Sequence, residues 1–174
     1  MKSLLAALML CLVATSTLAQ FSKPPTINYD PGEEEIWQEL NPEPPAAPKQ
    51  QSLLEFYVSA ATSNKYFIDA TTLAPGSDGI VRYVLVVLTS GGATNVSFEG
   101  MHCKERRWKH YASGRADGSW VKVNTPAWRP LENKQVNRHH AALSRDLFCP
   151  SGEPIRTADE GRNALRLGKH PDSK

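Results

Sequence analysis

The chain has 174 residues, of which 20 are Lys or Arg and 18 are Asp or Glu. This length is enough for one hydrophobic core and rarely enough for two. The near balance of charge gives no reason to expect nucleic acid or an anionic membrane surface as a partner. Thirteen prolines and eleven glycines favour a loop-rich, mostly β chain.

Residues 1–19 have the pattern of a cleavable secretory signal peptide. Lys2 precedes an apolar run from Leu4 to Val13, and small residues at the two cleavage-determining positions predict a cut after Ala19. We therefore expect an exported protein, in which loss of Lys2 leaves the side chains almost neutral.

Two other interpretations of this segment are open. A membrane anchor is disfavoured because the apolar run is shorter than the roughly 20 residues needed to cross a bilayer. Lipidation of Cys11 is disfavoured because Leu10 stands where a small residue is expected and Cys11 lies inside the apolar run. No other stretch is long and apolar enough, so we expect a protein that does not span the membrane.

Cleavage leaves two cysteines, Cys103 and Cys149, and an oxidising compartment predicts that they form a disulfide. His102, His139 and His140 add further zinc-ligand types. However, the close paired spacings typical of zinc sites do not occur. We expect a structural disulfide, no metal and no cofactor.

Residues 20–51 form a leader with seven prolines. Proline fixes φ and lacks an N–H donor, so this leader cannot pair continuously into a sheet. A short helix is expected near residues 32–40, with three glutamates at its N-terminus. A helix this short is not stable alone, so we expect Trp37 to dock it on the main domain.

The globular domain is expected to cover residues 52–170. Alternating or continuous apolar patterns predict strands, over residues 54–60, 66–69, 80–88, 94–103, 106–112 and 119–123. Residues 80–88 are apolar except at Arg82, so we place this strand in the centre of the sheet, covered on both faces. Short connections between strands favour an antiparallel meander.

One detail of this pattern bears on the disulfide. Cys103 is out of phase with Val96 and Phe98, which share one face of their strand. We expect either a β-bulge near Gly100 or a helix that covers the face opposite Phe98.

Helical patterns follow near the C-terminus. Asn137 is expected to cap a helix that carries Leu143 and Leu147 and ends at Cys149. A second helix is expected over 157–167, with a capping box at its start. The predicted fold class is α+β, with a single antiparallel sheet of about five or six strands in a meander, one or two C-terminal helices packed on it and a Pro-rich N-terminal leader.

A basic, aromatic-interleaved strand is the candidate ligand surface. It consists of Lys104, Arg106, Arg107, Trp108, Lys109, His110 and Arg115. Such a surface suits an anionic polymer, a lipid head group or a glycan. The competing interpretation is a sheet face whose long basic stems cover apolar surface while their charges stay in water.

His140 also has two interpretations. It lies in a polar cluster at the start of a predicted helix, where free N–H groups can bind anions. It is also in phase with Leu143 and Leu147, which favours a histidine at the edge of the core.

Motifs of catalysis are absent from the sequence. There is no G-x-S-x-G, H-E-x-x-H, P-loop or G-x-G-x-x-G pattern. We therefore expect a protein without catalytic activity. The alternative is a hydrolase or transferase whose site has no recognisable motif.

Several segments together resemble one known family. They are residues 54–59, 79–83, 89–100 and 114–120, followed by the helix of residues 137–150 with its cysteine. The combination resembles the cryptic neisserial protein one-like family, a group of uncharacterised exported proteins of Gram-negative bacteria, over about residues 37–167 of this chain.

The resemblance implies a periplasmic or outer-envelope location and no known activity, cofactor or catalytic residue. The function that we expect is a non-catalytic periplasmic or envelope module with a binding or structural role. Its expected partner is an envelope protein or an anionic envelope polymer, and nucleic acid is not expected. The alternative remains a periplasmic hydrolase or transferase.

Overall fold

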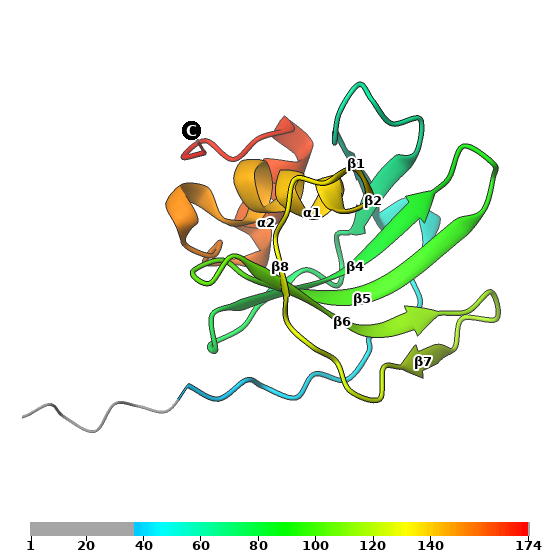
Figure 1. Cartoon of the computed structure of the whole chain (residues 1–174), viewed down its shortest axis with the longest axis horizontal. Coiled ribbons are helices and arrows are strands. Elements are labelled where there is room, and N and C mark those ends of the chain that lie inside the picture. The colour runs from blue at the N-terminus through cyan, green and yellow to red at the C-terminus, as the bar shows by residue number, and fades with distance from the viewer. Residues whose placement is uncertain (1–36, 174) are drawn as a thin grey trace, which may run out of the picture. The chain divides into compact units, whose positions relative to one another are not determined.

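The computed structural model describes residues 37–173. The predicted signal peptide, its cleavage site and the first part of the leader lie outside these residues. In the described part, a sheet carries a helical layer on one face and the remaining leader on the other (Figure 1). None of its helices is long and apolar enough to cross a bilayer.

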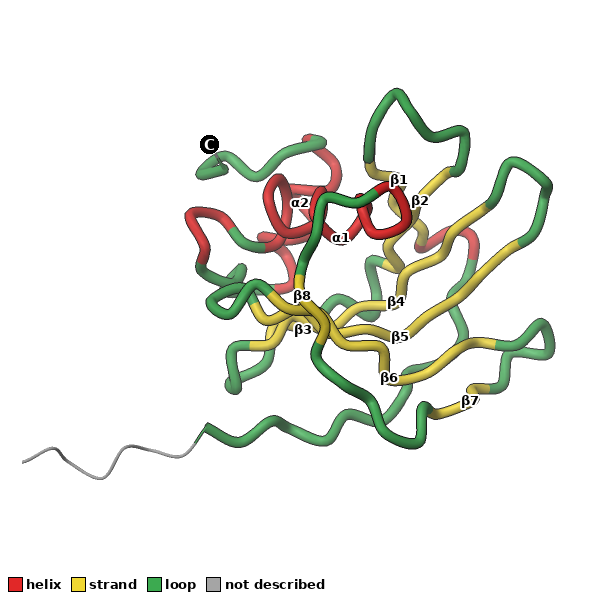
Figure 2. Tube along the Cα trace, viewed as in Figure 1, coloured by secondary structure: helices red, strands yellow, loops and turns green. Residues whose placement is uncertain are grey.

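The sheet is antiparallel throughout and has eight strands. They are β1 (Leu53–Phe56), β2 (Lys65–Asp69), β3 (Ala74–Pro75), β4 (Ile80–Leu88), β5 (Thr94–His102), β6 (Arg107–Gly114), β7 (Trp120–Lys122) and β8 (Arg129–Pro130). The main path runs β1-β2-β4-β5-β6-β7 (Figure 2). The predicted α+β meander is confirmed. The sheet has more strands than predicted because two short strands of two residues each lie off the main path: β3 pairs with β4, and β8 pairs with β6.

Strand β4 is the centre of the sheet, as its apolar run predicts. Residues 80–86 are all buried, so both faces of the strand are covered. The buried Arg82 is paired with Asp78, whose carboxylate lies 2.6 Å from the guanidinium. Burial opposes ionisation of Asp78, but the bond to Arg82 outweighs it and lowers the pKa of the carboxyl.

The helical layer explains the position of Cys103. Odd-numbered residues of β4 and β5, such as Tyr83 and Met101, pack with Cys103 against the helices, whereas Phe98 belongs to the opposite face. The helix expected opposite Phe98 is therefore confirmed. A bulge is also present between Phe98 and Glu99, but its extra residue is on β6 and leaves the alternation of β5 unchanged.

The first helical segment follows β8 and changes its geometry along its length. A 3₁₀ turn (Gln135–Asn137) leads into α1 (Arg138–Ala142), which continues as a π-helix (Leu143–Phe148). Asn137 occupies the N-cap position but makes no capping bond through its side chain. The segment ends before Cys149, as predicted, and a 3₁₀ turn (Pro150–Gly152) follows.

The second helix, α2 (Ala158–Leu167), begins and ends as its sequence predicts. The Thr157 hydroxyl accepts a hydrogen bond from the backbone N–H of Glu160 at 3.1 Å. The Glu160 carboxylate in turn accepts from the backbone of Arg156, one residue before the position expected in a capping box. Gly168 ends the helix with a left-handed φ of 76°.

The described part of the leader lies against the sheet face opposite the helices. We call residues 37–48 the strap. Trp37 donates its indole N–H to the Asp78 carbonyl at 2.8 Å, which confirms that Trp37 docks this segment. Residues 37–40, the part of the expected helix that the structure describes, are not helical. A 3₁₀ turn (Gln50–Ser52) connects the strap region to β1.

Glu39 connects the strap to the domain through three side-chain hydrogen bonds. Its carboxylate accepts hydrogen bonds from Lys109 at 2.6 Å, Tyr111 at 2.8 Å and Trp128 at 3.2 Å. Lys109 also lies over the Trp128 ring, 4.9 Å from its centroid. These bonds tie the strap to β6 and to the segment before β8.

The disulfide between Cys103 and Cys149 is confirmed, and it predicts a large loss of stability on reduction. The cysteines are 46 residues apart, a loop for which chain entropy gives about 4 kcal/mol. For a domain of this size we expect the melting temperature to fall by more than about ten degrees. Thermal unfolding of the wild type with and without reductant measures this. The C103S/C149S variant should melt low in both, and equal melting of oxidised and reduced wild type would contradict the prediction.

The strap offers a matched pair of substitutions. Glu39–Lys109 and Glu43–Lys122 have the same 2.6 Å distance, but the first pair is mostly buried and the second is mostly exposed. We expect Glu39→Gln to reduce the free energy of unfolding by about 2 kcal/mol. Glu43→Gln should change it by less than about 0.5 kcal/mol. Urea denaturation measures both values, and equal effects would contradict a structural role for burial of Glu39.

Candidate functional site

A cavity of about 620 Å³ lies where the turn from β5 to β6 meets the helical layer. Three segments form it: the turn from β5 to β6, the residues just after β8, and the helical segment of α1 and the π-helix with the turn that follows. Both disulfide cysteines line it, so the crosslink holds two of these segments together. This volume is in the range of pockets that bind small molecules.

Unusual backbone geometry surrounds this cavity. Within residues 37–173, Arg106 and Ser151 are the non-glycine residues with positive φ, at 53° and 54°, and both line the cavity. The π-helix contributes Ser144 and Arg145, and its wide turn is seen in the bond from the Cys149 N–H to the Ser144 carbonyl. Strained residues and π-helical turns concentrate at functional sites, which favours this cavity as the candidate site.

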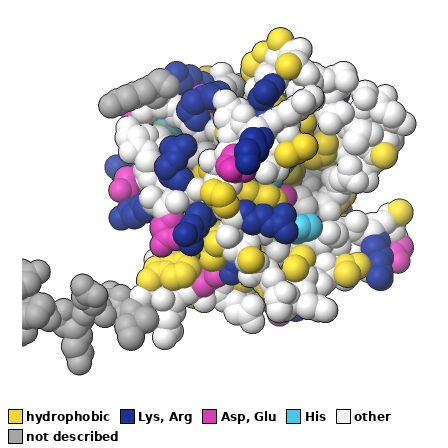
Figure 3. Space-filling view, viewed as in Figure 1, with side chains coloured by type: hydrophobic (Ala, Val, Ile, Leu, Met, Phe, Trp, Pro, Cys, Tyr) yellow, Lys and Arg dark blue, Asp and Glu magenta, His cyan; other side chains and the backbone are white. Residues whose placement is uncertain are grey.

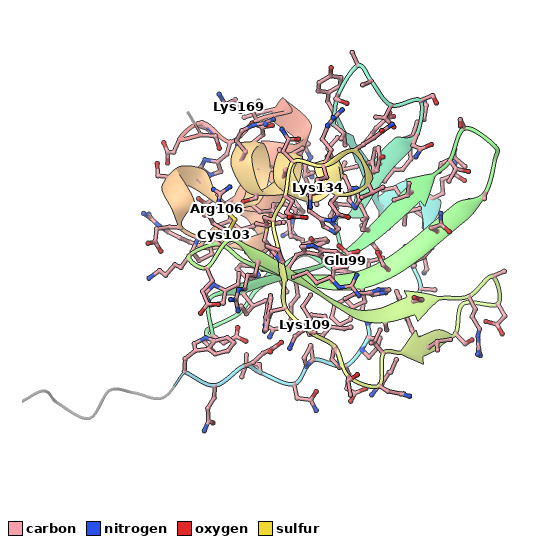
Figure 4. All side chains as sticks on the ribbon, viewed as in Figure 1. Glu99, Cys103, Arg106, Lys109, Lys134 and Lys169 are labelled. Atoms are coloured by element: carbon pink, nitrogen blue, oxygen red, sulfur yellow. A yellow bond between two sulfur atoms is a disulfide. The ribbon has the colours of Figure 1, made fainter. Side chains whose placement is uncertain are left out.

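The cavity is basic, and one of its cations is uncompensated. Lys104 lies 3.4 Å from the Glu153 carboxylate, and Arg145 is bound by Asp146, which raises the pKa of the guanidinium. Arg106 has no carboxylate partner among the described residues. Figure 4 shows Arg106 beside Cys103 near the helical layer, and Figure 3 shows Lys and Arg side chains gathered on this face.

Neutral polar side chains of the cavity are also available for hydrogen bonds to a ligand. The Ser144 hydroxyl and the Asn133 amide line it and form no side-chain hydrogen bond within the described part of the chain. Ser151 has one hydrogen bond, a long one of 3.4 Å to the Asp172 carbonyl. The site therefore presents a guanidinium, an amide and hydroxyls, which can hold an anion and neighbouring hydroxyl groups.

The structure distributes the predicted ligand surface over several environments. Lys104 and Arg106 line the cavity. Arg107 is exposed and lies 3.6 Å from Glu105, and Arg115 is exposed in the turn from β6 to β7. The other three lie along β6, where alternation turns Trp108 and His110 towards the helices and Lys109 towards the strap.

A second polar cluster lies inside the molecule, apart from the cavity. The His140 ring is bonded through Nε2 to the Glu99 carboxylate at 2.8 Å, and Ser97 donates to the other carboxylate oxygen at 2.7 Å. Burial raises the pKa of Glu99, but His140 and the bonds from His140 and Ser97 outweigh it and lower the pKa to about 2. The position of His140 in the core agrees with its phase along the helix.

Aromatic rings stack around this pair. His140 lies on Trp108 with ring centroids 3.7 Å apart, His139 follows at 4.0 Å from His140, and Tyr66 stacks on His139 at 5.2 Å. Burial is the main cause that lowers the pKa of His139 to about 4, and the nearby His140 lowers it further. His139 is therefore held neutral in the column.

The Glu99–His140 pair is enclosed. A carboxylate that orients an imidazole is a part of several hydrolase sites, where the imidazole must reach a nucleophile and a substrate. Here the two side chains are only 5% and 2% exposed, and neither lines the cavity. The geometry is that of a buried structural pair.

Sequence reasoning missed several cavity residues. Asn133, Ser144, Arg145 and Ser151 come from separate segments, and no spacing in the sequence connects them. The one local signal was the Pro-Ser-Gly turn that contains Ser151, because such a turn tolerates unusual φ values.

These features define a disulfide-bonded α+β domain built on one open antiparallel sheet, with a basic cavity under its helical layer. Residues 32–166 match the model of the CNP1-like family, so the chain belongs to this family. This confirms the resemblance seen in the sequence.

Among curated proteins, the chain is similar to Cryptic neisserial protein 1 of Neisseria gonorrhoeae (strain ATCC 700825 / FA 1090). The two are 26% identical over 106 residues, which cover 53% of this chain and 52% of that protein. The chain thus spans about half the length of the curated relative it matches. No solved structure matches the chain.

The half-buried His139 predicts that acid destabilises the domain. His139 has a pKa of about 4 in the folded state and about 6.5 when unfolded, so the unfolded chain takes up the proton first. Stability is therefore fully present above about pH 6.5 and falls by about 2–3 kcal/mol as the pH decreases towards 4. The stability contributed by ionised Glu99 is lost only below about pH 4.5, because its pKa is about 4.5 in the unfolded chain and about 2 in the folded one.

Melting curves between pH 7.5 and 4.5 test this window. His139→Phe keeps a ring against Tyr66 but cannot titrate, so its melting temperature should fall less than that of the wild type between pH 6.5 and 4.5. Equal slopes for the two proteins would show that His139 does not cause the acid sensitivity.

Proposed function

We propose that this chain is an exported, non-catalytic binding module of the bacterial envelope, and that the basic cavity binds an anionic group of its ligand. The observation that carries the proposal is the uncompensated Arg106 guanidinium, held at a strained backbone position beside uncommitted polar groups. Arg106 is exposed, so a ligand from solution can reach its guanidinium without displacing a carboxylate.

Three observations support an envelope location. Residues 1–19 have the pattern of a signal peptide, and the one disulfide of the described chain suits an oxidising compartment. The similar protein named above comes from Neisseria gonorrhoeae. A binding role is favoured over the alternative of a periplasmic hydrolase or transferase, because the buried Glu99–His140 pair does not line the cavity.

Anion titrations of the full mature chain test the proposal. We expect citrate or pyrophosphate at millimolar concentration to raise the melting temperature and to shift the NMR signals of residues around the cavity. Arg106→Gln should weaken this binding about tenfold or more, because a charge-assisted bond is lost.

Arg107→Gln is the matched control. Arg107 is the next residue along the chain and is likewise exposed, but it is paired with Glu105 and lies outside the cavity lining. Its binding should equal that of the wild type. The proposal fails if the wild type binds neither anion, or if Arg106→Gln binds as well as Arg107→Gln.

A further inference from the structure

We infer that the ligand of the basic cavity is a small acidic sugar, a hydroxylated ring that carries a single carboxylate. This inference rests on the proposed function and specifies the class of its ligand. It follows from the charge, the neutral polar groups, and the size and walls of the cavity.

The charged side chains around the cavity leave one cation free, so they suit a ligand with one negative group. Glu153 and Asp146 offset Lys104 and Arg145, so Arg106 alone remains uncompensated. A ligand with several negative charges would find one free cation here and would keep its other charges in water, so charges beyond the first add little to its binding. The planar guanidinium can hold one carboxylate by two parallel hydrogen bonds.

The neutral groups suit hydroxyls. The Asn133 amide both donates and accepts, and a serine hydroxyl can do either. The Ser144 side chain belongs to a largely buried residue and has no hydrogen-bond partner in residues 37–173, so it can bond to a ligand hydroxyl. A ligand with hydroxyls around its ring would satisfy these groups, whereas a simple inorganic anion would leave most of them unused.

The size and the walls fit the same class. At about 620 Å³ the cavity is far larger than one carboxylate and has room for a sugar ring. Leu131, Ala141 and the disulfide give it apolar patches against which the C–H groups of such a ring can pack. The cavity therefore offers both polar and apolar contacts, as a sugar ring requires.

Titration calorimetry of the mature chain with four probes tests the inference: glucuronate, galacturonate, glucose and acetate. We expect at least one uronate to bind about tenfold or more tightly than both glucose and acetate. Arg106→Gln should reduce uronate affinity to that for glucose. Asn133→Ala, a change at an exposed position, should weaken uronate binding several-fold and leave acetate binding unchanged.

The outcomes separate this inference from the proposed function. If citrate or pyrophosphate binds with dependence on Arg106 but neither uronate binds more tightly than acetate, the sugar assignment is overturned and the anion-binding proposal stands. If no anion binds the wild type, both are overturned. If Asn133→Ala weakens acetate and uronate equally, recognition of hydroxyls by Asn133 is refuted.

Discussion

The burial of β4 on both faces is the constraint on which the rest of this structure depends. A strand whose residues 80–86 are all buried, and apolar except at Arg82, must be covered on both faces, and a sheet of this size cannot cover its own faces. The helical layer covers one face, with Leu143, Leu147 and Phe148 in the main core. The strap lies along the other, where its backbone is bonded by Arg82 and Trp120. The prolines of the strap prevent it from pairing continuously as a further strand, so it covers this face through separate side-chain and backbone contacts instead.

Covering the first face also creates the cavity. The disulfide joins the turn after β5 to the end of the π-helix, and it fixes the helical layer where the sheet turns back into β6. Arg106 lies in that turn and takes a left-handed conformation, while Ser151 does the same in the turn after Cys149. The two strained residues are thus placed directly beside the two halves of the crosslink. A covalent bond is well suited to maintain conformations that the backbone alone disfavours.

Sequence patterns predicted those features that depend on neighbours in the chain. The apolar run of β4, the Thr157 cap and the end of the helix before Cys149 are all local. The disulfide was predicted because two cysteines remain after the predicted cleavage of the signal peptide. The position of the strap was not predictable in the same way, because the bonds of Glu39 reach residues 70 to 89 positions away. The alternation of side chains along the basic strand was predictable. Which of its cations form ion pairs was not, because partners such as Glu39 come from other segments. The cavity depends on three segments that only the topology brings together.

Whether a charged side chain has a partner within the domain distinguishes the structural polar groups from the candidate binding site. Arg82 is paired with Asp78, Lys109 with Glu39 and Glu99 with His140, each by a hydrogen bond of 2.8 Å or less. These pairs join the strap, the sheet and the helical layer, and each satisfies a charge that burial would otherwise penalise. Arg106 differs from them, since it is exposed at the cavity and the described residues supply no carboxylate for it. Its guanidinium is therefore available to a partner from outside, and the free amide and hydroxyl beside it indicate that the partner is more than a single ion.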